Sequence, residues 1–364
     1  MTEKKKRICF VNTVSCWGGG EKWHYEATLQ LQKEDYEIFF LTHPNSVLSK
    51  KLKAANVKTF LIKIKKNSWL NPFKIKKITR LFIEHRIDTV IINSSPDVKA
   101  CGLAAHKAGC RKIIYRRGSA RPIKNTIINR RVFGKWLTDV LANSEATKKS
   151  INAINPAMFP EEKIKVIYNP IDTTPFLENK IHNQPVKNDV IVIGNLARLA
   201  KQKNQIFLIR LASKLKEQGV QFKIIIGGTG SLQAELEHEI QKEQLTHEVK
   251  LLGFQKNAIQ FMNRCDIFLL PSLWEGFGYA IAEASLCCKP VIAFNVSSNP
   301  EVIINNKTGF LTGVNDIEDT IKKIKLFAED NELAQSMGNN GFAYCNKMFN
   351  KEHIYNQLTE YLNK

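Results

Sequence analysis

Apolar segments of strand length alternate with amphipathic segments of helix length along the 364 residues of this sequence. In the first half, Ile8–Val11 and Thr89–Ile92 have the composition of buried strands, whereas Lys22–Gln32 and Phe73–His85 have helical periodicity. Such a strand–helix–strand series favours a parallel sheet with helices on both faces. The alternation therefore predicts an α/β fold.

A second series of the same kind occupies the other half of the sequence. Its strand candidates are Val190–Ile193, Phe222–Ile226, Val249–Leu252, Ile267–Leu270 and Pro290–Ala293. Polar residues and proline interrupt the pattern before it, at residues 171–185, where we place a linker. We predict two doubly wound, Rossmann-like domains at residues 1–170 and 186–345, with a helix at 346–364 that could cross back to the first domain.

The net charge of +20 is confined to the first of these domains. Residues 1–170 carry 33 Lys and Arg against 13 Asp and Glu, and the remaining residues carry 21 of each kind. A basic domain joined to a neutral one suggests a polyanionic surface as partner of the first and a small ligand for the second. A uniformly basic chain would instead favour a nucleic-acid-binding protein.

The cysteines and apolar segments argue for a cytoplasmic protein, either free or peripheral on the inner face of the cytoplasmic membrane. The eight cysteines form no CxxC pair and have no metal-ligand spacing, as expected for reduced thiols. Only a strand-length apolar run follows the basic N-terminus, so we expect no signal peptide. No apolar run has the length of a membrane span.

Two carboxylates, Glu275 and Glu283, lie eight positions apart across a glycine-rich junction between a strand and a helix. Gly276 and Gly278 let the backbone approach a ligand, and the first amides of the helix favour an anion. Carboxylates accept hydrogen bonds from hydroxyls, which suits a sugar or a ribose. The junction is therefore a candidate nucleotide-sugar site. For an isolated pair, a helix-capping Glu275 and a solvent-facing Glu283 would be the simpler interpretation.

Two cations follow the first strand of the second domain. Arg198 and Lys203 precede the next helix, where fixed positive charges and a helix N-terminus together can bind a diphosphate. Either residue alone would be interpreted as a solvated surface cation. Their position after a strand favours a role in the site.

Glycine-rich turns follow three other strand candidates. These turns contain Gly18, Gly19 and Gly20 in the first domain, and Gly228, Gly253 and Phe254 in the second. The first turn lacks GxGxxG spacing, but its amides could contact a sugar or phosphate, and Phe254 could offer an apolar face to a base. Each turn is a weak signal by itself, because tight turns use glycine for steric reasons.

These features occur in the order found in the retaining glycosyltransferases of family 4, which the chain resembles over nearly its whole length. The matching segments are Gly18–Glu21, Leu141–Thr147, Val166–Asp172, Arg198 with Lys203, Gly228–Gly230, Glu275–Glu283, Pro300–Glu301 and Thr308–Phe310. The resemblance implies the GT-B architecture, in which two Rossmann-like domains face a central cleft. It also implies sugar transfer from a nucleotide-sugar to a glycan or lipid-linked acceptor in cell-envelope polysaccharide or lipopolysaccharide synthesis.

The resemblance assigns roles to individual residues. The implied donor contacts are Arg198 and Lys203 with the diphosphate, Glu283 with the ribose, and Glu275 with Gly276, Phe277 and Gly278 around the sugar. No Asp-x-Asp motif is present to hold a divalent ion, so we expect the transfer to be independent of metal ions. We expect the donor to be a UDP- or GDP-sugar and the enzyme to need no cofactor. A same-face displacement, in which the departing phosphate helps to deprotonate the acceptor hydroxyl, also follows from the resemblance.

The sequence departs from the family pattern at one position. The family often has a histidine before a glycine at the end of a first-domain strand, where this chain has Arg117 before Gly118. A guanidinium cannot act as a base. We therefore expect Arg117 to act electrostatically, on the leaving phosphate or on an anionic acceptor.

A lysine-rich segment of the first domain also contains aromatic residues. Its members are Lys63, Lys65, Lys66, Trp69, Phe73 and Lys74. The ordinary interpretation is an amphipathic helix with a lysine-rich outer face. We expect in addition that this segment rests on anionic lipid and presents a lipid-linked acceptor.

Two other functions remain open from the sequence. A nucleotide-sugar epimerase of the same architecture would need acids for proton abstraction and would consume the donor without an acceptor. A nucleic-acid-binding protein would show steeply salt-dependent binding to DNA or RNA. The neutral second half argues against nucleic acid as a partner.

Overall fold

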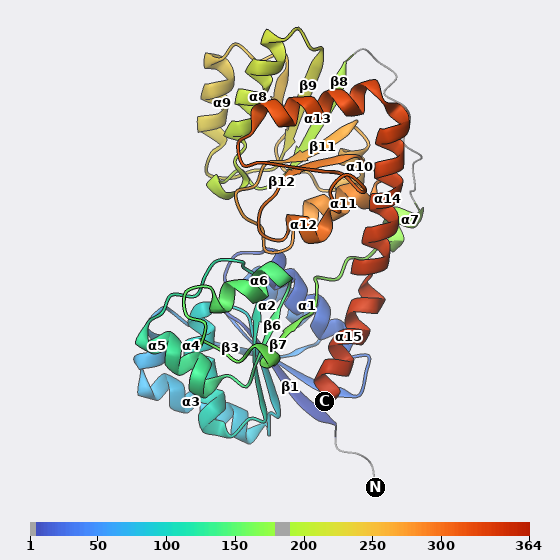
Figure 1. Cartoon of the computed structure of the whole chain (residues 1–364). Helices are drawn as coiled ribbons and strands as arrows, with labels where there is room; N and C mark the ends of the chain where they lie inside the picture. Colours follow the sequence, from blue (N-terminus) through green and yellow to red (C-terminus); the bar gives the residue numbers. More distant parts are fainter. Residues whose placement is uncertain (1–4, 179–189) are drawn as a thin grey trace. The chain divides into compact units, whose positions relative to one another are not determined.

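The computed structural model describes residues 5–178 and 190–364 (Figure 1). Within these residues the chain divides into two compact units. The first unit contains the chain up to Pro170 together with Glu352–Lys364, and the second unit runs from Ile171 to Lys351. The last helix of the sequence thus packs with the N-terminal half of the chain.

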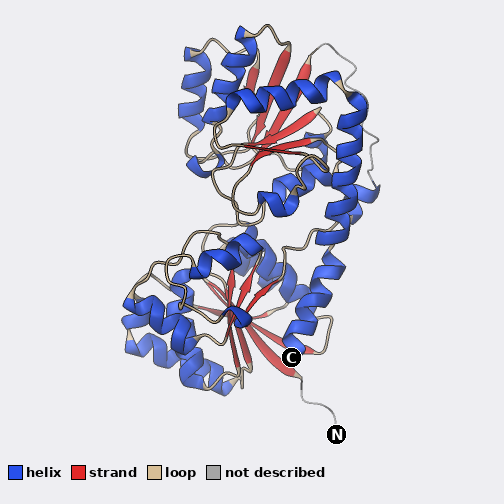
Figure 2. Ribbon diagram, in the orientation of Figure 1, coloured by secondary structure: helices blue, strands red, loops and turns tan. Residues whose placement is uncertain are grey.

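The first unit is built on a sheet of seven parallel strands in the order β3-β2-β1-β4-β5-β6-β7 (Figure 2). The strands are β1 Lys6–Asn12, β2 Tyr36–Thr42, β3 Lys58–Leu61, β4 Thr89–Ile92, β5 Lys112–Arg117, β6 Asp139–Ala142 and β7 Ile164–Val166. The order reverses between β1 and β4. Their carboxyl ends therefore lie side by side at a switch point, where open α/β sheets bind ligands.

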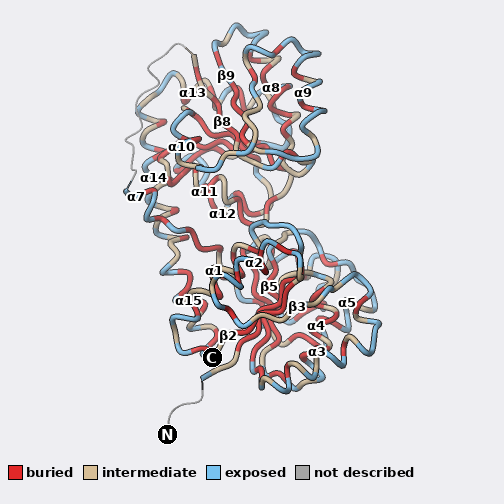
Figure 3. The backbone as a smooth tube through the Cα atoms, turned by 180° about the vertical axis from the view of Figure 1, so that it is seen from behind, coloured by how far each residue is buried: buried red, intermediate tan, exposed pale blue. Residues whose placement is uncertain are grey.

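Helices cover both faces of this sheet. They are α1 Gly19–Leu31, α2 Val47–Ala54, α3 Pro72–Glu84, α4 Ser95–Ala108, α5 Ile127–Arg131, α6 Glu145–Asn152 and α15 Lys351–Asn363, with short 3-10 helices at Ser68–Leu70 and Glu161–Lys163 and a short π-helix at Val132–Trp136. Side chains alternate across β1, so that Cys9 and Val11 join the core under α3 and α4, whereas Ile8 and Phe10 join the core under α1, α2 and α15. Figure 3 shows the buried strands enclosed by these helices.

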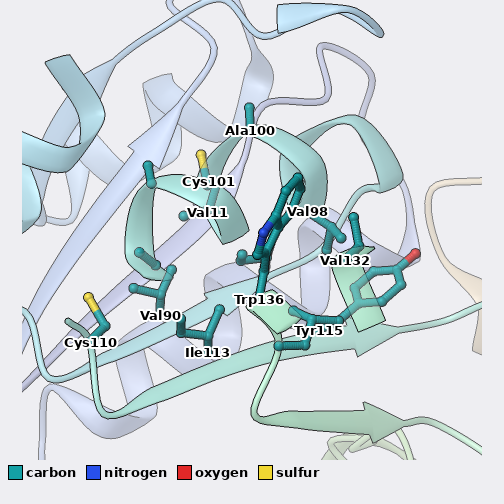
Figure 4. Close-up of a cluster of buried hydrophobic side chains, with 14 of the residues drawn as sticks. Val11, Val90, Val98, Ala100, Cys101, Cys110, Ile113, Tyr115, Val132 and Trp136 are labelled. Carbon is teal, nitrogen blue, oxygen red and sulfur yellow. The ribbon is translucent and has the colours of Figure 1, made fainter. Parts of the chain in front are cut away.

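The sequence of α3 explains why it forms and which face it buries. Asn71 caps the helix by accepting a hydrogen bond from the Lys74 amide, and Pro72 occupies the first turn. Ile75, Ile78 and Phe82 follow at helical spacing and are all buried. Figure 4 shows part of the core beneath α3 and α4, with side chains from β1, β4, β5 and α4.

The C-terminal helix α15 is anchored by apolar and polar contacts to the first unit. Ile354, Leu358 and Leu362 are buried in the core under α1 and α2. At its end, the Tyr36 hydroxyl donates to Asn363 Oδ1 at 2.9 Å.

The second unit repeats this architecture with six parallel strands in the order β10-β9-β8-β11-β12-β13. The strands are β8 Ile191–Leu196, β9 Phe222–Gly227, β10 Val249–Leu251, β11 Ile267–Leu270, β12 Val291–Phe294 and β13 Phe310–Thr312. Its helices are α7 Thr174–Glu178, α8 Ile206–Glu217, α9 Gln233–Lys242, α10 Ala258–Met262, α11 Tyr279–Leu286, α12 Asn299–Val302, α13 Ile317–Glu329 and α14 Asn331–Phe349, with a short turn at Lys201–Lys203. The strand order reverses between β8 and β11, which brings their carboxyl ends together.

The predicted α/β fold with two doubly wound parallel sheets is confirmed. Strands β7 and β13, which have three residues each and lie at sheet edges, were not predicted. Helix α7 lies in the segment predicted as a linker, and residues 179–185 of that segment, with residues 186–189 of the predicted second domain, lie outside the described residues. Among the described residues, no helix combines the length and apolarity needed to cross a membrane.

Candidate functional site

Four loops meet at the carboxyl edge of the second sheet, and they contain most of the predicted donor-binding residues. We call residues 197–203, 228–231, 253–254 and 271–278 the second-unit edge; they follow β8, β9, β10 and β11, which are neighbours in the sheet. Hydrogen bonds join the loops directly, since the Leu199 amide donates to the Thr229 carbonyl at 3.0 Å and the Leu273 amide donates to the Gln202 carbonyl at 2.9 Å. The sheet topology thus assembles residues that are far apart in sequence.

An ion pair between Lys203 and Glu275 lies at the centre of this edge. Lys203 Nζ lies 2.5 Å from Glu275 Oε1, and the two side chains are only 18% and 7% exposed. The helix-capping interpretation of Glu275 is wrong, because Gly278 occupies the N-cap of α11 and no side chain caps it. The structure therefore joins the predicted sugar ligand and one of the predicted diphosphate ligands in one charged pair.

Arg198 lies on the same loop as Lys203 but is exposed. The loop is held by the buried side chain of Leu199 and by Gln205 Nε2, which donates to the Arg198 carbonyl at 3.1 Å. Helix α8 begins two residues after Asn204, and no side chain caps its N-terminus. The amides of Phe207 and Leu208 at the start of α8 donate to the carbonyls of Asn204 and Gln205 at 3.0 and 2.9 Å, so the group on this loop that favours an anion is the exposed guanidinium of Arg198.

The glycines of the β9 turn are required by close packing of the loops. A Cβ atom at Gly228, where φ is 138°, would lie 1.9 Å from the Ala197 carbonyl oxygen, and one at Gly230 would lie 2.1 Å from the Leu199 carbonyl oxygen. The Gly228 amide donates to the Gly253 carbonyl at 2.7 Å. These contacts give both glycines a structural role that needs no ligand.

The remaining predicted donor ligands differ in how they are exposed. Phe254 is 75% exposed, so its ring is open to a ligand, whereas Phe277 is 3% exposed and packs edge-on against Phe349 at 4.9 Å. Phe277 therefore supplies packing through its side chain. Glu283 is partly buried in the second turn of α11, rather than facing solvent fully.

The corresponding edge of the first unit is built from buried carboxylates and neutral partners. We call residues 12–21 and 93–97, after β1 and β4, the first-unit edge. Asn12 Nδ2 donates to Glu21 Oε1 at 3.1 Å, and Asn93 Nδ2 approaches the same oxygen at 3.4 Å. Of the predicted turn, Gly18 is the N-cap of α1, and Gly19 and Gly20 are its first two residues. A Cβ atom at Gly20 would lie 2.8 Å from Asn93 Nδ2, so the start of the helix packs against this contact. Sequence reasoning gave Glu21, Asn12 and Asn93 no role, because only strand pairing shows that they meet.

A second buried carboxylate, Asp97, holds the start of the same loop. Its oxygens accept hydrogen bonds from the Thr13 amide at 3.0 Å and from the Thr13 hydroxyl at 2.5 Å. Burial raises the pKa of Asp97 from its ordinary value, and the hydrogen bonds from Thr13 oppose that rise. The sequence signal that could have identified Asp97 is its place in the first turn of α4, beside the end of β1.

Arg117, predicted as an electrostatic group, is buried at the end of β5. Its Nη2 donates to the Arg121 carbonyl, and its Nη1 donates to the Tyr115 hydroxyl at 3.4 Å. The next side chain along the strand, Arg116, lies on the other face and stacks over Trp23 at 4.6 Å from the ring centroid. Both guanidiniums therefore have structural contacts within the first unit.

The lysine-rich segment combines an open aromatic residue with a locally fixed lysine. Phe73 is 83% exposed at the start of α3, and neighbouring Leu70 is 61% exposed, whereas Trp69 is partly buried. Lys74 Nζ donates to the Lys63 carbonyl at 2.8 Å, which fixes the loop before the helix. In the part of the chain that the structure describes, no three His, Cys, Asp or Glu side chains are grouped to hold a metal ion.

Two family models match the chain, and together they cover most of it. The model for glycosyltransferase family 4 matches residues 17–175, and the model for group 1 glycosyl transferases matches residues 178–344.

Two named relatives illustrate the similarity in sequence. The capsular polysaccharide biosynthesis glycosyltransferase CapM of Staphylococcus aureus is 31% identical over 241 residues, which span 62% of this chain and 61% of CapM. The N-acetylgalactosamine-N,N'-diacetylbacillosaminyl-diphospho-undecaprenol 4-alpha-N-acetylgalactosaminyltransferase of Campylobacter jejuni is 28% identical over 224 residues, which span 61% of this chain and 59% of that enzyme.

A solved structure shows the same fold. The crystal structure of Alr3699/HepE from Anabaena in complex with UDP-glucose matches with a TM-score of 0.80 at 22% sequence identity. The match covers 98% of this chain and 99% of that one.

Proposed function

The chain belongs to glycosyltransferase family 4, and from that premise we propose that it moves a sugar from a nucleotide-sugar to a glycan or lipid-linked acceptor. We further propose that the transfer retains the anomeric configuration and needs no metal ion, and that it serves cell-envelope polysaccharide or lipopolysaccharide synthesis. The named capsule enzyme and the named diphospho-undecaprenol enzyme among the relatives support this class of product and acceptor.

The observation that carries the proposal is the ion pair of Lys203 and Glu275 beside the exposed Arg198. A nucleotide-sugar presents a diphosphate and several hydroxyls, which need cations and hydrogen-bond acceptors respectively. Without donor, Lys203 neutralises the buried carboxylate of Glu275. With donor, Lys203 and Arg198 would share the diphosphate charge, and Glu275 would accept a hydrogen bond from a sugar hydroxyl.

The same groups would promote cleavage of the bond between sugar and phosphate. Negative charge grows on the departing diphosphate, and the positive charges of Arg198 and Lys203 would stabilise it. Glu283 would hold the ribose, and the amides of residues 276–278 would position the sugar. Phe254, with its exposed ring, would lie against the base.

The first unit would supply the acceptor side of the reaction. The turn Gly18–Gly20 lies at the switch point of its sheet, and Arg117 ends a neighbouring strand. Arg117 would act on negative charge only by rearranging its contacts with Tyr115 and Arg121.

A peripheral site on the cytoplasmic face of the membrane would bring this unit to a lipid-linked acceptor. The exposed side chains of Phe73 and Leu70, flanked by Lys63, Lys65 and Lys66, support contact with anionic lipid. Binding to anionic liposomes should fall when these three lysines are changed to Glu. Unchanged binding would remove this part of the proposal.

A thermal-shift screen of UDP-, GDP- and ADP-sugars tests the donor site. A ligand present at about 100 times its Kd stabilises a protein by about 2.7 kcal/mol, which is easily measured. UDP-glucose is the first candidate, because a structural neighbour was solved with it. A true donor should stabilise the wild type and Arg210→Ala, whose arginine is exposed on α8, but not Arg198→Ala. The absence of any stabilising donor would remove the main support for the transferase proposal.

A further inference from the structure

The loop after β1 carries an exposed tryptophan on a rigid base. Trp17 is 39% exposed, in a loop whose first residue, Thr13, is tied to the buried Asp97 and whose end is tied through Glu21. Asn12 Oδ1 also accepts a hydrogen bond from the Val14 amide at 3.2 Å. Because both ends of the loop are held by hydrogen bonds, the position of Trp17 is fixed.

Trp17 belongs to a cluster with one residue from each of two neighbouring helices. Its ring meets Tyr25 of α1 edge-on, with centroids 6.3 Å apart. Lys51 of α2 lies over both rings, with Nζ 5.1 Å from the Trp17 centroid and 5.5 Å from the Tyr25 centroid. Helices α1 and α2 are in contact and lie side by side in Figures 1 and 3.

Within the described residues, no carboxylate balances the charge of Lys51. No Asp or Glu lies within ion-pair distance of Lys51 in the described ranges 5–178 and 190–364. The attraction between ammonium and ring faces holds the side chain in place, but it leaves a net positive charge beside an open indole. The cluster therefore combines an aromatic surface with an available cation.

We propose that Trp17, Tyr25 and Lys51 form a subsite for an anionic sugar of the acceptor, meaning a sugar ring that carries a carboxylate or a phosphate. The C–H face of the ring packs on the exposed indole, and the anionic group pairs with Lys51. The aromatic surface alone would accept any sugar, and the unpaired lysine adds the preference for charge. This assignment rests on the transferase function proposed above and narrows its acceptor class.

The location of the cluster suits this task. The loop that carries Trp17 starts at the end of β1, at the switch point of the first sheet. The subsite lies wholly within the first unit and uses none of the residues assigned to the donor. Donor binding and acceptor selectivity can therefore be tested separately.

Indole-labelled protein gives a direct test without any sugar transfer. The chain has five tryptophans, so ¹⁵N-indole spectra contain few signals, and Trp17→Phe identifies the signal of Trp17. The anionic probes are methyl glucuronide and glucose 1-phosphate, and the uncharged methyl glucoside is the control. We expect the Trp17 signal to shift with one or both anionic probes and to saturate at least fivefold more tightly than with the neutral glucoside.

Two variants of α2 test whether the preference for anionic sugars depends on Lys51 itself or only on the positive charge of the helix. Lys51→Met should abolish the preference for the anionic probes, whereas Lys53→Met, which removes an equal charge from the same helix, should keep it. The two probes distinguish a carboxylate from a phosphate as the source of charge. A Trp17 signal that ignores every probe, responds equally to charged and neutral sugars, or responds alike in both variants would overturn the assignment. The donor screen would still report on the transferase function, so the two failures are distinguishable.

Discussion

The two sheet edges have the same topology but use charge in opposite ways. At the first-unit edge, Glu21 and Asp97 are buried among neutral amide and hydroxyl donors, and they fix a loop. At the second-unit edge, Glu275 is paired with Lys203, and Arg198 remains exposed on the same loop. The excess positive charge of the first half therefore forms no ion pair with Glu21 or Asp97 in the part of the chain that the structure describes. Fold alone therefore does not locate the chemistry, whereas the type of partner at each carboxylate does.

The largest effect should come from breaking the ion pair at the second-unit edge. Lys203→Met leaves Glu275 buried and unpaired, which should cost about 3 kcal/mol of unfolding free energy. The double variant Lys203→Met with Glu275→Leu should recover most of that loss, because both charges are gone. Urea denaturation of both variants measures this. Equal loss in the single and double variants would mean that the pair is not coupled as described.

A smaller effect is expected when a first-unit carboxylate becomes an amide. Asp97→Asn can still accept from the Thr13 amide and can donate to the Thr13 hydroxyl, so it should cost less than about 1 kcal/mol. Asp97→Ala leaves Thr13 without its partner and should cost about 2 kcal/mol.

The pH dependence of these Asp97 variants carries a definite sign. The pKa of Asp97 is raised in the folded state, so its protonation favours folding. The unfolding free energy of wild type should increase relative to that of Asp97→Asn as the pH falls through the folded-state pKa of Asp97. This gain should be lost again as the pH rises through that pKa. Parallel stability curves for the two proteins would contradict the raised pKa.

The smallest effect concerns His24, a buried residue next to the first-unit edge. Among the described residues neither ring nitrogen has a hydrogen-bond partner, and the ring lies 5.4 Å from Phe10. Burial, with a contribution from Arg116, lowers the pKa of His24 well below its ordinary value. Below about pH 6.5 the unfolded chain takes up a proton on His24 that the folded state does not accept. The free energy of unfolding should therefore fall with pH in that range, by up to about 1.4 kcal/mol per pH unit.

Replacing His24 should remove that dependence. His24→Phe should be at least as stable as wild type at pH 7.5, because an unsatisfied polar ring is removed, and should gain up to about 1 kcal/mol. The difference in unfolding free energy between His24→Phe and wild type should widen from pH 7.5 to pH 5.5, because only the unfolded wild type gains a proton on His24 in that range. Melting curves that show the same difference at both pH values would refute the prediction, since they would mean that His24 titrates alike in the folded and unfolded states.

The sequence predicted the fold well, because apolar strand segments such as Thr89–Ile92 are long enough to stand out from their surroundings. It also placed Arg198, Lys203 and Glu275 after strands, which is where the structure has them. It could not predict the contact between Lys203 and Glu275, which are 72 positions apart. Nor could it predict the pairing of Thr13 with Asp97, which are 84 positions apart. Both contacts depend on which strands are neighbours, and no local pattern records that order.

Donor affinity of the double variant Lys203→Met with Glu275→Leu tests the central claim most directly. The claim is that the charge pair at the second-unit edge exists to bind the donor and is not needed for the fold. Calorimetric titration with the donor found in the screen should show binding weakened at least 100-fold, although the variant unfolds cooperatively near the wild-type midpoint. A stable double variant that binds the donor with wild-type affinity would contradict the claim.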